Sequence, residues 1–112
     1  MSIAENFQKI GLCKYEALAL EAVLKGESTA EAIANKSGVP ISKIYFTLKA
    51  LQDKGIVKSS LGRPRKYEAA EPEQLIELLK KPHEERIKEI RKIAKQTLKQ
   101  ISGMGYESSK LS

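Results

Sequence analysis

Glycine and proline divide residues 28–69 into two short helical segments followed by two short strand-like segments. The helical spacing of apolar residues is interrupted at Ser37-Gly38-Val39-Pro40 and again at Gly55. Glycine can adopt positive φ there, and proline cannot continue a preceding helix. Residues 56–59 and 65–69 then flank a loop that contains Gly62 and Pro64, which is typical of a hairpin. Few folds accommodate a helix, a turn, a helix and a hairpin in this order.

The two helices and their turn predict a helix-turn-helix. A capping-box pattern at Ser28-Thr-Ala-Glu31 opens the first helix, and the second spans residues 41–54 with Ile44 and Leu48 on one face. A generic corner between two helices would share these features. The hairpin that follows directly favours a winged helix-turn-helix instead. The predicted fold class is therefore mainly α with a small β-hairpin, a winged helix-turn-helix followed by a C-terminal dimerisation helix.

Positive charge is concentrated in the same segment. Residues 35–67 contain eight lysines and arginines and one acid, a net charge of +7, whereas the whole chain carries +6. A focused basic surface is typical of a protein that binds a polyanion, and double-stranded DNA is the partner that this motif predicts. We expect phosphate contacts from the start of the first helix, from Lys36 and from the wing, and base contacts from the second helix. The candidate DNA-binding residues are Ser28, Thr29, Lys36, Ser42, Lys43, Tyr45, Phe46, Lys49, Arg63, Arg65 and Lys66.

Two of these assignments have structural alternatives. Phe46 lies about 160° around the helix from the apolar stripe at 100° per residue, so we expect it outside the core, although phenylalanine is usually buried. Arg63-Pro64-Arg65 could be an ordinary solvated turn. Its two arginines around a stiff proline also suit phosphate binding or a narrow minor groove.

The remaining segments are predicted to be helical. Helices are expected at 2–10, 14–25 and from Glu71 onward, and Pro82 is expected to start or kink a final helix that reaches residue 102. Residues 1–81 form the predicted DNA-binding domain, 82–103 a coiled-coil-like dimerisation helix and 104–112 a flexible tail. Alternate spacings of three and four residues define an apolar seam on the final helix, which predicts a homodimer unless the seam packs on its own domain. The candidate dimerisation residues are Ile87, Ile90, Ala94, Thr97 and Ile101.

Signals for other functions are weak. His83 is the only histidine and Cys13 the only cysteine, so we predict no metal site, no cofactor and no catalytic centre. Cys13 is expected to be a small buried side chain, with a redox sensor as the alternative. No membrane-spanning run and no signal peptide are visible, which predicts a cytoplasmic location.

Four stretches are informative together, and they are Ile10–Ala17, Ala34–Tyr45, Leu48–Val57 and Gly62–Tyr67. They resemble the TrmB family of transcriptional regulators, which are chiefly archaeal. The resemblance covers residues 7–79 and implies an N-terminal winged helix whose second helix reads operator DNA, with a wing that carries Arg63, Arg65 and Lys66. Family members also have a large sugar-binding domain that these residues do not include, so sugar sensing is not carried over. Ile41 and Phe46 stand where the family often has charged residues, which leaves the base preference open.

The sequence therefore predicts a homodimeric, sequence-specific transcription regulator. Two other functions stay open. An architectural protein would coat DNA with little sequence preference, and a protein-interaction winged helix would use this domain inside a larger assembly. Whether the protein represses or activates, and which effector it senses, does not follow from the sequence.

Overall fold

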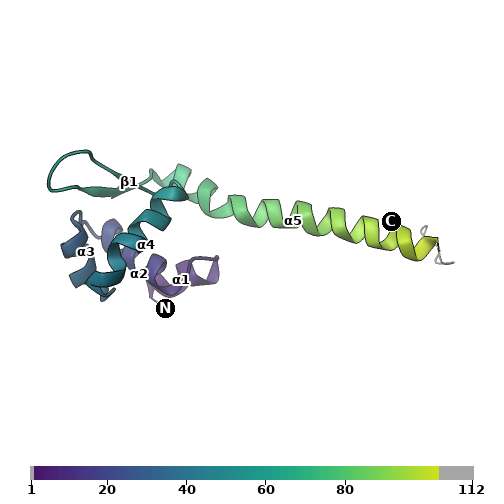
Figure 1. The fold of residues 1–112 in the computed structure, drawn as a ribbon, viewed down its shortest axis with the longest axis horizontal. Helices are drawn as coiled ribbons and strands as arrows, with labels where there is room; N and C mark the ends of the chain where they lie inside the picture. Colours follow the sequence, from purple (N-terminus) through teal and green to yellow (C-terminus); the bar gives the residue numbers. More distant parts are fainter. Residues whose placement is uncertain (1, 104–112) are drawn as a thin grey trace. The chain divides into compact units, whose positions relative to one another are not determined.

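The computed structural model describes residues 2–103, which form two compact units that meet between Leu79 and Lys80. The predicted tail at 104–112 lies outside the described residues. Within them the elements follow the order of Figure 1. They are α1 (Ile3–Lys9), α2 (Lys14–Leu24), α3 (Ala30–Ser37), α4 (Ile41–Asp53), β1 (Val57–Ser59), β2 (Tyr67–Ala69) and α5 (Pro72–Ser102).

The core of the first unit joins all of its helices to the hairpin. Leu20 of α2, Ile33 of α3 and Leu48 of α4 are completely buried, and Val57 of β1 is 1% exposed. Burying each such aliphatic side chain contributes about 1.5–3 kcal/mol of transfer free energy. The helix-turn-helix of α3 and α4 is therefore held against α2 and the hairpin, and the unit is a winged helix-turn-helix, as predicted.

The predicted N-cap of α1 and the predicted end of α3 are confirmed, and the predicted N-cap of α3 is corrected. The Ser2 hydroxyl accepts from the Glu5 amide at 3.0 Å and caps α1 as expected. Gly38 ends α3 with φ of +81°, a conformation that glycine adopts without strain. The predicted cap of α3 is wrong by one residue, because Thr29, and not Ser28, is the N-cap and accepts from the Ala32 amide at 3.2 Å.

The physical reason is that the hairpin pairs with Ser28 and Thr29. The Tyr67 amide donates to the Ser28 carbonyl at 2.7 Å, and Thr29 forms an antiparallel bridge with Lys66. Thr29 is thus held in extended backbone, with φ of −96° and ψ of 153°, and the helix begins after it.

The hairpin is shorter than predicted. β1 and β2 are antiparallel and pair Val57 with Ala69 and Ser59 with Tyr67. The Gln52 amide group donates to the Ser59 hydroxyl at 2.7 Å, which links the end of α4 to β1. The wing is therefore attached at its base to the start of α3 and to the end of α4.

Helix α5 runs without interruption from Pro72 to Ser102, with Pro82 inside it. The interpretation that Pro82 starts a separate helix is wrong. Proline removes one amide donor, but the leucines, lysines and glutamates on both sides are strong helix formers, so the helix continues.

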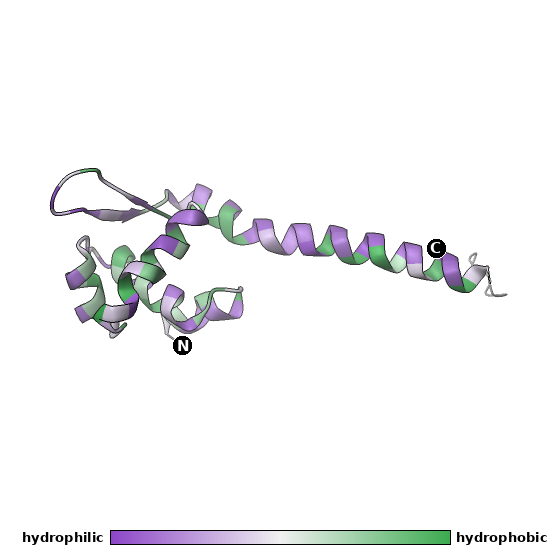
Figure 2. Cartoon of the chain, viewed as in Figure 1, coloured by the Kyte–Doolittle hydropathy of each residue, from purple (hydrophilic) through white to green (hydrophobic). Residues whose placement is uncertain are grey.

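Apolar residues recur along α5 in the second unit (Figure 2). In the single chain Ile87, Ile90 and Ile101 are 57%, 51% and 40% exposed. Within residues 2–103, no helix is both long enough and apolar enough to cross a membrane.

Candidate nucleic-acid interface

Helix α4 has one buried and one exposed face. Ile44, Leu48 and Leu51 have no exposed surface, whereas Phe46 is 80% and Tyr45 56% exposed. The alternative in which Phe46 belongs to the core is therefore wrong, and the predicted outward position of both aromatic side chains is confirmed. Such rings can contact a thymine methyl group or a sugar.

Two residues beside the buried stripe of α4, Thr47 and Ile41, differ in exposure. Thr47 is 4% exposed, and its hydroxyl donates to the Lys43 carbonyl at 2.9 Å. Burial is tolerated because the hydroxyl is satisfied within its own helix. Ile41 is 54% exposed because it begins the helix, where the preceding Pro40 is itself exposed.

The polar part of the same face is partly neutralised. Ser42, Lys43 and Lys49 are exposed as predicted. The Lys49 ammonium lies 2.9 Å from the Asp53 carboxylate, one helical turn further on. Because both groups are exposed, this ion pair contributes little to stability, but the carboxylate lowers the positive charge at the interface.

The wing carries exposed cations and an unpredicted apolar residue. Arg63, Arg65 and Lys66 are exposed. Leu61, in the loop between the strands, is 98% exposed. Its only signal in the sequence was its position beside Gly62, which is too general to identify a contact residue.

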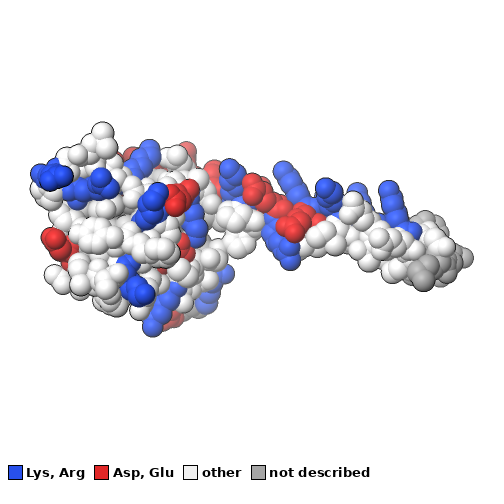
Figure 3. Space-filling model, in the orientation of Figure 1, with Lys and Arg blue, Asp and Glu red and all other residues white. Residues whose placement is uncertain are grey.

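Basic side chains dominate the wing and extend over the face of α4 shown in Figure 3, with isolated acids among them. Lys36, which is exposed, lies in the last turn of α3. It is thus at the opposite end of that helix from Thr29. The predicted site residues therefore form a broad surface and do not converge on one pocket.

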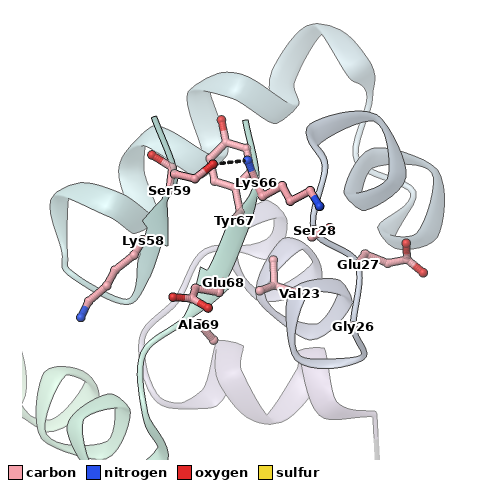
Figure 4. Close-up of a pocket in the computed structure, with 11 residues that line it drawn as sticks. Val23, Gly26, Glu27, Ser28, Lys58, Ser59, Lys66, Tyr67, Glu68 and Ala69 are labelled. Carbon is pink, nitrogen blue, oxygen red and sulfur yellow. Dashed lines mark hydrogen bonds between the residues drawn. The ribbon is translucent and has the colours of Figure 1, made fainter. Parts of the chain in front are cut away.

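Three of the predicted site residues, Ser28, Thr29 and Lys66, lie together at the base of the wing. Ser28 and Thr29 are half-buried and pair with the hairpin, and the Lys66 side chain extends toward the turn before α3 (Figure 4). A hollow of about 590 Å³ lies beside this junction, with Lys58 and Ser60 also in its lining. A lysine next to the amide end of a helix is suited to an anion such as a phosphate.

One lysine of the basic segment has a structural role. The Lys54 ammonium donates to Oε2 of Glu16 at 2.7 Å, and the Cys13 amide donates to Oε1 at 3.0 Å. Glu16 is 5% exposed. Burial alone would raise the pKa of this carboxyl, but hydrogen bonds from Cys13 and Lys54 lower it below its usual value. The Lys54–Glu16 pair therefore joins α2 to the end of α4.

Cys13 is exposed, so the expectation of a buried cysteine is wrong. Its backbone occupies the N-cap of α2, which holds it at the surface. Partial burial and a hydrogen bond to Glu16 raise the pKa of the thiol. A raised pKa favours the unreactive protonated form and argues against redox sensing. The described residues contain no group of three or more histidine, cysteine or acidic side chains that could hold a metal ion.

Comparison with known proteins decides the family. The model of the sugar-specific transcriptional regulator TrmB family matches residues 7–73. The chain belongs to the TrmB family. The match spans α2 to α4, the hairpin and the start of α5, so the exposed aromatic and basic residues lie on the TrmB winged helix-turn-helix.

Two curated TrmB relatives are each 34% identical to the chain. One is the sugar sensing transcriptional regulator TrmBL1 of Pyrococcus furiosus, aligned over 90% of this chain. The other is the DNA-binding transcriptional repressor TrmBL2 of Thermococcus kodakarensis, aligned over 78%. These alignments cover 30% and 32% of the relatives, so the chain spans about a third of their length.

A solved structure shares this TrmB fold. It is that of TrmBL2, described as an archaeal chromatin protein with a novel mode of DNA binding. Its TM-score is 0.78 at 27% identity, and the alignment covers 91% of this chain and 41% of that one.

Proposed function

We propose that the chain is a transcription regulator that binds double-stranded DNA as a homodimer. The observation that carries the proposal is the outward face of α4, which presents Phe46, Tyr45 and Lys43 next to a basic wing in a TrmB winged helix-turn-helix. Like its relatives it would act in transcription and not in catalysis, and this role implies a cytoplasmic location with the DNA.

Base recognition is assigned to α4 in the major groove. Ser42, Phe46 and Lys49 lie opposite the buried stripe of Ile44 and Leu48. A helix that enters the major groove reads base edges through a few such outward side chains. A good base contact contributes about 1–3 kcal/mol of discrimination.

Phosphate contacts are assigned to the surrounding cations. Arg63 and Arg65 are exposed on the wing, and Lys66 lies beside Thr29 at the amide end of α3. Lys36 would add a contact at the other end of that helix. These contacts fix the position of α4 on the duplex and carry little sequence information.

Homodimerisation is assigned to the apolar seam of α5. Ile87, Ile90 and Ile101 are exposed in the single chain, and Ala94 and Thr97 lie between them at heptad spacing. A helix pair that buries this seam would bring two winged helices to one DNA site.

An architectural role is the second candidate. It is favoured by the TrmBL2 structure, because that relative is described as a chromatin protein. Both candidates predict salt-dependent affinity, with a slope of about 0.9 in log K against log salt for each phosphate contact. Only sequence preference separates them.

Selection of bound duplexes from a random pool tests the proposal. A regulator enriches one motif, with half-sites related by the two-fold symmetry of the dimer. Retained binding without enrichment would favour the architectural role.

Failure to shift any duplex at low salt would contradict DNA binding altogether. Two variants that each remove one positive charge calibrate the assay. Arg63→Ala on the wing should weaken binding, whereas Lys99→Ala, exposed on α5, should leave it unchanged.

A further inference from the structure

We infer that the second copy packs on α5 in the antiparallel direction, with Ile90 of each chain against Ala94 of its partner. The inference rests on the homodimer proposed above and specifies its geometry. It follows from the sizes of the seam residues, from a hollow in the seam and from the charges beside it.

In the seam, Ile87 and Ile90 form a large half, Ala94 and Thr97 form a small half, and Ile101 follows them. Ile87 and Ile90 are bulky and 57% and 51% exposed, whereas Ala94 and Thr97 follow where the next two large residues would stand. The Thr97 hydroxyl donates to the Ile93 carbonyl of its own helix at 2.8 Å. Thr97 therefore needs no polar partner and can act as a small apolar residue.

A hollow of about 410 Å³ lies over the small half. Ile90, Ile93 and Leu98 surround it, with Arg86 at its edge, and Ala94 and Thr97 complete its lining. Paired helices pack each seam residue of one chain into a hole of the other. This hollow has the position of such a hole and has room for a large residue from the partner.

Parallel packing would not supply one. Each seam residue would then face its own copy, so Ala94 would meet Ala94 and Thr97 would meet Thr97, and the hollow would remain. Parallel pairs also disfavour β-branched residues at the second seam position of each heptad, which is where Ile90 and Thr97 stand.

Antiparallel packing matches large residues with small ones. When Ile90 faces the partner's Ala94, Ile87 faces the partner's Thr97 in the adjacent layer. Each isoleucine then fills the space that a smaller residue leaves, as close packing requires. The same two contacts recur on the other side of the two-fold axis.

Charges beside the seam favour the same direction. Arg86 and Arg91 occupy the two flanking heptad positions that oppose each other in a parallel pair, which gives two arginine–arginine contacts. In the antiparallel pair Arg86 faces the partner's Gln100, and a single contact between the two Arg91 side chains remains. Like-charge contacts destabilise a helix pair, and the antiparallel pair has fewer of them.

The two directions place equivalent residues at different separations. In the antiparallel pair the two Lys92 residues lie at the same level, whereas the two Lys81 residues are about 33 Å apart along the axis at about 1.5 Å per residue. The two Lys99 residues are about 21 Å apart on the same basis. In a parallel pair all three separations along the axis are close to zero.

Electron spin resonance measures these separations directly. Lys81, Lys92 and Lys99 are exposed, and each is replaced by cysteine and spin-labelled in a Cys13→Ser chain. The inference predicts the longest distance at 81, an intermediate one at 99 and the shortest at 92. Equal distances in a stable dimer would overturn the antiparallel direction and leave the homodimer intact, whereas a monomer at all concentrations would overturn both.

Ala94→Ile gives a second test, because the two packing directions predict opposite changes in the dimer dissociation constant. In the antiparallel pair the new side chain meets the partner's Ile90, so the dimer dissociation constant should rise by about tenfold, about 1.4 kcal/mol. In a parallel pair it would fill the layer with isoleucine and tighten the dimer. Lys95→Ala, which is exposed and outside the seam, is the control. A tighter Ala94→Ile dimer would overturn the inference.

Discussion

Replacement of Phe46 by alanine tests whether this side chain contacts DNA or stabilises the core. Phe46 is 80% exposed, so only a fifth of its surface is buried. Full burial of such a side chain contributes about 1.5–3 kcal/mol, so the folded protein should lose only about 0.3–0.6 kcal/mol. At about 4–8 °C per kcal/mol for a domain of this size, the melting temperature should fall by about 1–5 °C.

DNA recognition should respond far more strongly. Loss of one base contact costs about 1–3 kcal/mol on the preferred site, which is about 5- to 150-fold in affinity. Binding to random duplexes should barely change, since phosphate contacts carry it.

Thermal melts beside binding curves on preferred and random duplexes measure both effects. Leu48→Ala, on the buried face of the same helix, is the matched control. It should cost about 2–5 kcal/mol of stability, because Leu48 has no exposed surface. A fall in melting temperature for Phe46→Ala as large as that of Leu48→Ala, with unchanged sequence preference, would refute the assignment of this face.

Three further perturbations test other parts of the molecule. The pKa of Glu16 is lower in the folded protein than its ordinary value of 4.5. The ionised carboxylate therefore contributes its full stability at a pH above 4.5, and this contribution is lost as the pH falls through the pKa of the folded protein. Glu16→Gln should flatten this acid branch in melts recorded against pH. Asp53→Asn removes the carboxylate 2.9 Å from Lys49 and should strengthen DNA binding several-fold, whereas unchanged affinity at low salt would place α4 away from the DNA. Ile90→Asp should give monomers in light scattering with a sharp loss of affinity for paired half-sites, and a surviving dimer would exclude the seam as the interface.

Local sequence signals predicted the ends of α3 and α4 at their glycines and the buried and exposed faces of α4. Gly38 and Gly55 adopt positive φ where the chain was expected to turn, because glycine acts through its own backbone. Phe46 was placed outside the core from helical spacing alone. These features depend on residues within one or two helical turns, so the sequence suffices.

Features that depend on distant residues were not predictable. The cap of α3 moved to Thr29 because β2 pairs with the preceding backbone. Glu16 became a buried partner of Lys54, a contact across 38 positions, and the same carboxylate accepts from the Cys13 amide. Leu61 is exposed on a loop where no periodic pattern applies.

Hydrogen bonds at both strands of the wing hold it to the helix-turn-helix. Tyr67 bonds to Ser28 before α3, and Gln52 of α4 bonds to Ser59 of β1. These bonds fix the angle between α4 and the base of the wing, so under the proposed function little conformational entropy would be lost when the domain binds DNA. Under the proposed function, substitutions in the loop between the strands would change the affinity for all duplexes while the supporting frame stays unchanged, so this loop is the natural place for overall affinity to evolve.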